Sequence, residues 1–221
     1  MRANDREDLL YSKGKRVRID KEEKYMLSLV GSPSNKNKTL LDVGCGTGEM
    51  SEELNKLGFE TFGLDFSSVA IDIAKKNGVK CKQADLDLGI PADDASFDIA
   101  WAGDVIEHVF DPLGVLSEIS RVLVPGGSFL ATIPHDLNYK VRIKTLLGIS
   151  YQEAVYRKFR QFKHHTFFSE NLLRYMYESS NLKIQQITYL IKVPILKLEF
   201  FTKIRLLRIF STLMIVKSVK N

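Results

Sequence analysis

Between residues 38 and 134, short apolar runs alternate with segments in which apolar residues recur every three or four positions. The apolar runs predict parallel strands, because a strand buried on both faces carries apolar side chains on both. The segments between them predict amphipathic helices. We therefore expect an α/β fold, with a doubly wound sheet, right-handed crossovers and helices on both faces. The expected strands lie within residues 39–48, 59–65, 79–84, 97–102 and 128–133.

The first expected strand runs into a turn with glycine at every second position, Gly44, Gly46 and Gly48. A helix should follow, capped by Thr47 or by the backbone near it. Glycines here let a ligand approach the backbone closely at the positive end of the helix dipole, which is a nucleotide-binding geometry. Glu49 stands where a dinucleotide-binding turn has Gly or Ala, and its charge would repel a pyrophosphate. A ligand without phosphates therefore suits the turn better.

Acidic residues follow the second and third expected strands, where ligands of such sheets bind. Asp65 can accept hydrogen bonds from both hydroxyls of a ribose. Asp85 would lie beside a base and can accept from an exocyclic amine, while Leu86 offers a backbone N–H and an apolar contact. The pattern thus predicts a nucleoside site.

The pattern changes after residue 136. Residues 137–168 are basic and aromatic, and an insertion this long over the mouth of a sheet is usually a functional lid. A helix over 170–179 with Ser169 as its cap should follow. Two further strands are expected at 183–191 and 211–219.

Residues 193–210 are apolar, with lysines and arginines interspersed near helical spacing. They predict a basic amphipathic helix that either lies on an anionic membrane or covers the substrate pocket. The charge of the chain is uneven: residues 1–136 hold 16 Lys and Arg against 23 Asp and Glu, and residues 137–221 hold 16 against 4. This positive field suits an anionic substrate, an anionic membrane or nucleic acid, or is simply a solvated basic surface.

The composition, 44% apolar and 27% charged, is that of a soluble globular protein. Cys45 and Cys81 lack metal-ligand spacing, so no metal site is expected. A reducing cytoplasm fits these two cysteines best. Peripheral contact of the protein with a membrane is a further option. No apolar run reaches the roughly 18 residues of a membrane span, and the N-terminus lacks the apolar core of a secretory signal. We expect a single domain over residues 1–221. It would comprise an N-terminal helical cap (1–37), a cofactor-binding core (38–136), a lid insertion (137–168) and a C-terminal completion of the sheet (169–221).

Five segments resemble, in order and spacing, the successive motifs of class I S-adenosylmethionine-dependent methyltransferases. The segments are Leu40–Met50, Gly63–Asp65, Ala84–Leu86, Phe97–His108 and Leu123–Gly127. The sequence of residues 105–112 is similar to that of small-molecule members, including quinone-biosynthesis methyltransferases. The resemblance implies a Rossmann-like sheet of seven strands in the order 3-2-1-4-5-7-6, with strand 7 antiparallel.

The resemblance also implies a site for S-adenosyl-L-methionine. Asp42 and the amides of Gly44, Gly46 and Gly48, with Cys45 between them, would surround the methionine moiety. Asp65, followed by Phe66, would take the ribose hydroxyls, and Asp85 and Leu86 would take the adenine. Ala102 and Gly103 would line the site next to the sulfonium group.

The expected activity is methyl transfer to a small-molecule or lipid-like acceptor, perhaps an anionic one. Positioning in a dry site should carry most of the rate, and an oxygen or nitrogen acceptor also calls for a base. His135 and His165 are the candidates for that base, because imidazole titrates near neutral pH. Orienting a loop is an equally good role for either. Glu107 and His108 are expected to serve local structure.

Other readings stay open. The chain could be a non-catalytic S-adenosylmethionine-binding protein or a membrane-associated partner protein. An NAD-dependent oxidoreductase is disfavoured by Glu49. A nucleic-acid methyltransferase would fit the basic C-terminal part, but Gly103–Ile106 stands where amino-methylating members carry an Asn-Pro-Pro-Tyr-like tetrapeptide.

Overall fold

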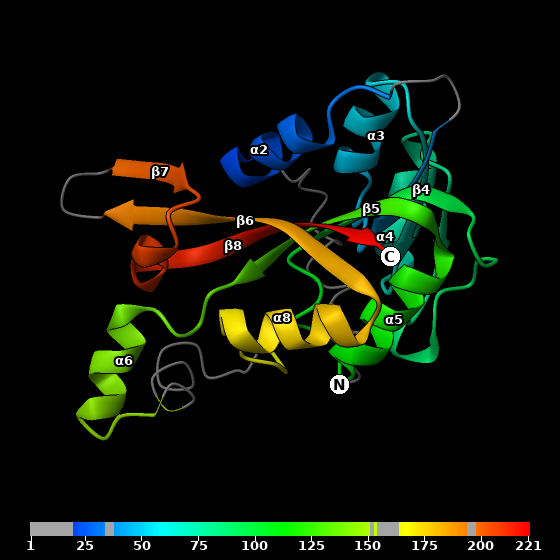
Figure 1. Cartoon of the computed structure of the whole chain (residues 1–221). Helices are drawn as coiled ribbons and strands as arrows, with labels where there is room; N and C mark the ends of the chain where they lie inside the picture. Colours follow the sequence, from blue (N-terminus) through cyan, green and yellow to red (C-terminus); the bar gives the residue numbers. More distant parts are fainter. Residues whose placement is uncertain (1–19, 34–37, 151–152, 154–163, 194–197) are drawn as a thin grey trace.

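The computed structural model describes residues 20–33, 38–150, 153, 164–193 and 198–221. In this part of the chain eight strands form one sheet in the order β3-β2-β1-β4-β5-β8-β6-β7 (Figure 1). Strands β1 to β5 are parallel, whereas β8 is antiparallel to both of its neighbours. The strands are β1 Thr39–Val43, β2 Glu60–Asp65, β3 Cys81–Gln83, β4 Phe97–Gly103, β5 Leu123–Pro134, β6 Leu182–Val193, β7 Leu198–Thr202 and β8 Ser211–Lys220.

Helices cover both faces of the sheet. Figure 1 shows α2 and α3 over one face, and α5 and α8 over the other. The first face buries Met26, Leu54 and Trp101 in one apolar cluster, and the second buries Leu116 and Tyr177 in another. The helices are α2 Lys21–Val30, α3 Glu49–Lys56, α4 Ser68–Lys76, α5 Pro112–Val122, α6 Tyr139–Leu146 and α8 Glu170–Ser179, with short 3-10 helices η1 Leu86–Leu88 and η3 Arg205–Phe210. The doubly wound α/β architecture is therefore confirmed.

The expected cap at Ser169 is present, and other helices are capped in the same way. The side chains of Ser67, Asp111 and Ser169 each accept a hydrogen bond from a backbone N–H of the first turn that follows. For α3 the second of the two expected alternatives holds, a cap by the backbone near Thr47, since the Thr47 hydroxyl donates to the carboxylate of Glu49. Gly48 is the N-cap of α3, in the left-handed conformation and without a side-chain bond.

In the residues that the structure describes, the sheet has eight strands, not the seven that the resemblance implied. The additional strand, β7, forms a hairpin with β6, and the ring of Phe201 stacks on Tyr25 of α2 at 4.3 Å between centroids. The helix expected over 193–210 is therefore wrong in the described residues 198–210, which form β7 and η3. The exposed edge of β6 offered backbone hydrogen bonds that local helical spacing could not reveal.

Some expectations fall on residues outside the described part. They include the N-terminal part of the cap, residues 1–19, and most of the lid between 151 and 163. The described part of the lid forms α6, which stands apart from the sheet in Figure 1. Its Tyr139 ring lies 5.4 Å from that of Phe210 in η3. In the described part of the chain, no helix has both the length and the apolar character needed to cross a bilayer.

Candidate functional site

The glycine turn after β1 has a backbone that only glycine adopts easily. Gly44, Gly46 and Gly48 have φ values of 74°, 52° and 91°. A Cβ on Gly44 would lie 2.4 Å from Cγ2 of Val105, and a Cβ on Gly48 would lie 2.8 Å from Cγ2 of Val79. The turn is thus packed directly against the segment that follows β4.

The amides of this turn are used inside the protein. Gly44 and Cys45 both donate to the carbonyl of Leu64, at 2.7 and 2.9 Å, and Gly48 donates to Cys45. Gly46 donates to the carboxylate of Asp65 at 2.9 Å. These amides therefore donate to acceptors within the turn and at the end of β2. The glycines contribute space for a close approach, and the buried Cys45 packs behind them.

Asp65 ends β2 and connects two parts of the site. One carboxylate oxygen accepts from Gly46, and the other accepts from the amide of Ser67 at 2.8 Å. Each oxygen of an ionised carboxylate has a second acceptor position, so the group can still receive hydroxyl donors. Next to it, the carbonyl of Phe66 accepts from the side chain of Gln83. The carboxylate is held in one orientation at the carboxyl edge of the sheet.

Asp42 is the buried acid of the site, with 2% of its surface exposed. Its carboxylate accepts one hydrogen bond of 2.6 Å from the hydroxyl of Ser51 in α3. Burial raises the pKa of Asp42 to about 7; the Ser51 bond opposes the rise and the nearby charge of Asp65 adds to it. The group can therefore change its charge near neutral pH when a cation binds close to it.

The edge beyond β3 is shaped by a short 3-10 helix. Asp85 caps η1 by accepting from the amide of Asp87, and Leu86 packs partly buried against the main core. The carboxylate of Asp87 accepts from the amides of Phe110 and Asp111, at 2.9 to 3.1 Å. This bridge from η1 to the segment after β4 was missed in the sequence, because it joins two loops.

Strand β4 ends at Ala102 and Gly103, which were expected to wall the sulfonium side. Ala102 is fully buried, and the following Asp104 has a left-handed backbone, with φ 53°. Its amide donates to the hydroxyl of Thr132 in β5, and that hydroxyl donates to its carboxylate, both at 2.8 Å. The ends of β4 and β5 are thereby joined directly.

The two candidate bases lie in different surroundings. His135 follows β5 and is 4% exposed; burial lowers its pKa, and its Nδ1 is buried without a hydrogen-bond partner. His165 is exposed, and its ring packs on Phe110 with 4.2 Å between centroids. His135 is thus a buried imidazole after β5, whereas His165 is an exposed imidazole beside Phe110.

A third group of side chains meets at the end of β4. Glu107 is 1% exposed, and burial, with smaller contributions from the charges of Asp104 and Asp136, raises the pKa of its carboxyl to about 8. Potential ligand atoms of Glu107, His108 and His164 lie within 4.8 Å of one another. The sequence assigned Glu107 and His108 to local structure, because nothing local places His164 beside them.

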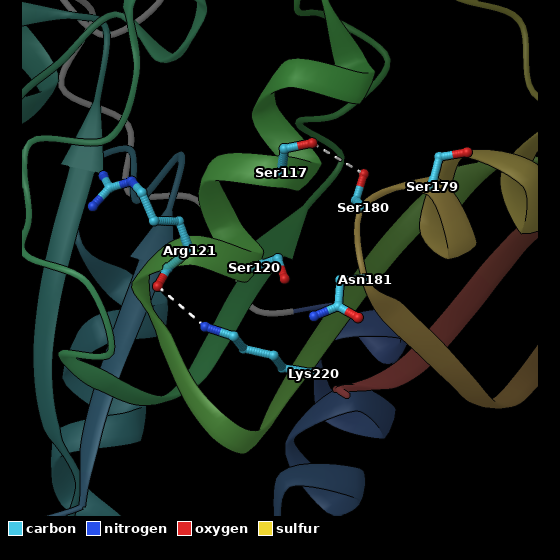
Figure 2. Close-up of a pocket in the computed structure, with 7 residues that line it drawn as sticks. All are labelled: Ser117, Ser120, Arg121, Ser179, Ser180, Asn181 and Lys220. Carbon is cyan, nitrogen blue, oxygen red and sulfur yellow. Dashed lines mark hydrogen bonds between the residues drawn. The ribbon is translucent and has the colours of Figure 1, made fainter.

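Two cavities lie at the opposite, amino edge of the parallel strands. The first, about 350 Å³, is lined by residues that include Ser117, Arg121 and Lys220 (Figure 2). Figure 2 shows the guanidinium of Arg121 directed away from the serines, and it pairs with Glu118 and Asp94. The amine of Lys220 donates to the carbonyls of Arg121 and Leu123. The second cavity, about 370 Å³, lies between α2 and the start of β5. The two cations of the first cavity, Arg121 and Lys220, already bind groups of the protein itself. The carboxyl edge of the sheet therefore remains the candidate site.

The chain resembles known proteins in sequence. Residues 41–131 match the family model described as "Methyltransferase domain". The chain is 37% identical over 123 residues to the ubiquinone biosynthesis O-methyltransferase of Coxiella burnetii, covering 52% of this chain and 51% of that protein. It is 30% identical over 121 residues to the Hahella chejuensis protein of the same name. The chain therefore spans about half the length of the curated relatives it matches.

Solved structures extend the likeness to the rest of the fold. A SAM-dependent methyltransferase of Thermotoga maritima, described as a possible histamine N-methyltransferase, matches with a TM-score of 0.66 and 20% identity over 90% of this chain and 87% of its own. Phosphoethanolamine N-methyltransferase 2 of Haemonchus contortus, in complex with S-adenosyl-L-methionine, matches with a TM-score of 0.67 and 17% identity over 90% of this chain and 52% of its own. Residues 41–131 therefore resemble a methyltransferase domain, and the chain has the fold of class I S-adenosylmethionine-dependent methyltransferases.

Proposed function

We propose that this protein is an S-adenosylmethionine-dependent methyltransferase that methylates a small-molecule or lipid-like acceptor. The observation that carries the proposal is the rigid pairing of the glycine turn with Asp65 at the carboxyl edge of the sheet. Class I folds bind their nucleoside at this edge. The curated relatives named as O-methyltransferases support a hydroxyl group as the acceptor.

The residues at this edge fit S-adenosylmethionine. Asp65 would accept the ribose hydroxyls, Asp85 and Leu86 would contact the adenine, and Asp42 would face the cationic methionine end. When bound, S-adenosylmethionine supplies an electrophilic methyl group on a sulfonium. Glu49 folds back onto Thr47 in the first turn of α3 and keeps a negative charge where a dinucleotide would place phosphates. The fit is to a nucleoside rather than to a dinucleotide.

The base for a hydroxyl acceptor would be His135. Burial lowers its pKa, so the imidazole is neutral at pH 7 and can take a proton. Its Nδ1 has no partner in the described part of the protein and is available as an acceptor if the neutral tautomer carries its proton on Nε2. His165, our other candidate, would instead hold the Phe110 loop through its ring contact.

Calorimetry with S-adenosylmethionine and S-adenosylhomocysteine tests the nucleoside site. Asp65→Ala should weaken binding about 10-fold or more, the scale of lost charge-assisted hydrogen bonds. Asp93→Ala is the matched control, because Asp93 is an exposed acid in the loop before β4, at the amino edge. Folded wild-type protein that binds neither compound would contradict the proposal.

Methyl transfer is tested with tritiated S-adenosylmethionine and cell extract, separated into lipid, small-molecule, protein and nucleic-acid fractions. Label is expected in the small-molecule or lipid fraction. Label confined to nucleic acid would overturn the acceptor class, and binding without any transfer would support a non-catalytic role.

We further propose a cytoplasmic protein that contacts anionic membranes peripherally through α6 and η3. Large apolar side chains are exposed on both elements, with Leu146 86% and Leu206 82% exposed. Lysines and arginines are interspersed among them, which suits anionic lipid headgroups. Such contact would bring a lipid-like acceptor to the site.

Flotation with vesicles of phosphatidylglycerol or of phosphatidylcholine tests this contact. Binding should require the anionic vesicles and weaken at high salt. Leu146→Ser with Leu206→Ser should reduce it, whereas Leu88→Ser should not, although Leu88 is 87% exposed, because it lies in η1. Equal flotation with both lipids, or an equal effect of the control, would contradict membrane contact at this surface.

A further inference from the structure

Three side chains that can bind a metal ion meet beside the end of β4. They are Glu107 and His108, in the turn after the strand, and His164, before α8. One potential ligand atom from each lies within 4.8 Å of the others. Atoms bonded at about 2.1 Å to one ion lie about 3–4 Å apart, so small side-chain rotations would bring the three into ligand geometry.

Glu107 is the buried member of the three. Its Oε2 is buried without a hydrogen bond in the described part of the protein. Its Oε1 lies 3.9 Å from Nε2 of His108, beyond hydrogen-bond distance. A buried carboxylate oxygen without a donor or a cation destabilises the folded protein. The position therefore calls for a positive partner.

The surrounding backbone holds the two histidines near this carboxylate. The amides of His165 and Thr166 donate to the carbonyl of Glu107, at 2.8 and 3.4 Å, so the segment before α8 is tied to the turn. The imidazole rings of His108 and His164 meet edge to face, with 5.1 Å between centroids. The side chain of His108 is 43% exposed, so its ring has room to turn toward an ion.

We propose that Glu107, His108 and His164 bind a divalent first-row transition-metal ion. Two imidazoles and one carboxylate suit zinc, iron, cobalt or manganese better than magnesium or calcium, which prefer oxygen ligands alone. Three protein ligands leave coordination positions open, as in catalytic rather than structural sites. No spacing in the sequence suggested this site, because its ligands come from two distant segments.

The role of the ion rests on the proposed methyltransferase function. The turn that carries Glu107 and His108 begins with Val105, which packs on Gly44 of the nucleoside-binding turn. An ion here would lie next to the place of methyl transfer. It would bind the acceptor hydroxyl oxygen in an open position and lower the pKa of that hydroxyl, which would ease transfer of its proton to the proposed base, His135. The substrate class is then an acceptor with a metal-binding hydroxyl group.

Titration of chelator-treated full-length protein with Co²⁺ tests the site, since its visible absorption reports coordination by nitrogen and oxygen. We expect one ion per chain, and an affinity reduced about 100-fold or more in Glu107→Gln and in His164→Gln. His165→Gln is the matched control, because His165 is adjacent in sequence but packs on Phe110 outside the cluster. Glu107→Gln replaces a buried carboxylate by a neutral group of the same shape, so it should fold, which a melting curve verifies.

Calorimetry with S-adenosylmethionine on the same samples separates this inference from the proposed function. If wild-type protein binds no Co²⁺, or if His165→Gln loses it as fully as His164→Gln, the metal site is overturned, whatever S-adenosylmethionine does. If Co²⁺ binding depends on Glu107 and His164 but S-adenosylmethionine does not bind, the metal site holds and the methyltransferase proposal fails.

Discussion

The hydroxyl of Ser51 donates a 2.6 Å hydrogen bond to the carboxylate of Asp42, and both side chains are almost completely buried. Ser51 belongs to α3 and Asp42 to β1, so the bond holds the helix to the strand directly beneath the glycine turn. Hydrogen bonding to Ser51 does not replace the water that the carboxylate loses on folding. The site therefore contains an acid whose charge is costly until a cation approaches.

This acid should make stability depend on pH. The pKa of Asp42 is about 7 in the folded protein, against 3.8 for the unfolded chain. Between these values only the folded state holds the proton, so the free energy of unfolding falls as pH rises, by up to about 4 kcal/mol. Urea unfolding of wild type and Asp42→Asn at pH 5, 6, 7 and 8 measures this. The free energy of unfolding of the variant should rise relative to that of wild type toward pH 8. A difference that is the same at every pH would contradict the prediction.

The same group should couple S-adenosylmethionine binding to proton release. A cation near Asp42 favours its ionised form, so binding should tighten as pH rises through about 7 and then level off. Calorimetry in two buffers of different ionisation enthalpy counts the protons released at pH 6.5. Asp42→Asn should release fewer, and equal release would place the proton elsewhere.

The glycine turn should tolerate no side chain at Gly44. The Cβ would strike Val105, and φ is already 74°. Together the strain and the overpacking should cost about 2–4 kcal/mol of unfolding free energy. Gly126→Ala is the matched control, with φ 75° but no atom within 4 Å of the added Cβ, and it should cost about 1 kcal/mol. Equal losses in both variants would show that contact with Val105 does not matter.

Much of the fold could be predicted because it depends on local chemistry. The side chain of Ser169 accepts a hydrogen bond from the amide of Leu172, only three residues further on, and α8 begins and ends at the expected residues. The glycines of the first turn and the acid at the end of β2 could be identified from the local sequence in the same way. Their backbone and side-chain requirements are set within a few residues of sequence.

The rest depends on partners that are distant in the sequence. Residues 198–202 became a strand because β6 and Tyr25 lie beside them, although their spacing also suits a helix. The acceptors of the amides in the glycine turn could not be predicted for the same reason. They are Leu64 and Asp65, which lie in β2. The neighbourhood of Glu107 and His164 exists only in the folded chain.

Asp87 should stabilise the loop that carries the proposed metal ligands. Its carboxylate accepts from the amides of Phe110 and Asp111, and these bonds fix the end of that loop. Asp87→Ala should cost about 1–2 kcal/mol in unfolding free energy and increase hydrogen exchange over residues 104–111. Asp94→Ala, which removes an exposed ion pair with Arg121, should change neither by more than about 0.5 kcal/mol. Unchanged exchange in Asp87→Ala would mean that the loop is held by other contacts.

Glu170 should stabilise the C-terminal part of the chain. It is 3% exposed and binds Arg174 in α8, Arg208 in η3 and the hydroxyl of Tyr189 in β6, at 2.7 to 3.0 Å. Burial by itself would raise the pKa of Glu170, but these three hydrogen bonds outweigh it and lower the pKa below its usual 4.5. The stabilisation is therefore complete above about pH 4.5 and is lost as pH falls through the lowered value.

Substitution of Glu170 by glutamine should reveal this contribution. At pH 7, Glu170→Gln should lose about 2–3 kcal/mol, because the arginines keep their charge without a partner. Glu178→Gln, on the same helix but exposed, should stay within about 0.5 kcal/mol of wild type. The deficit of Glu170→Gln should shrink below pH 4.5, as wild type loses its own charge there. A deficit that is the same at pH 3.5 and pH 7 would mean that the side chain acts through packing and not through its charge.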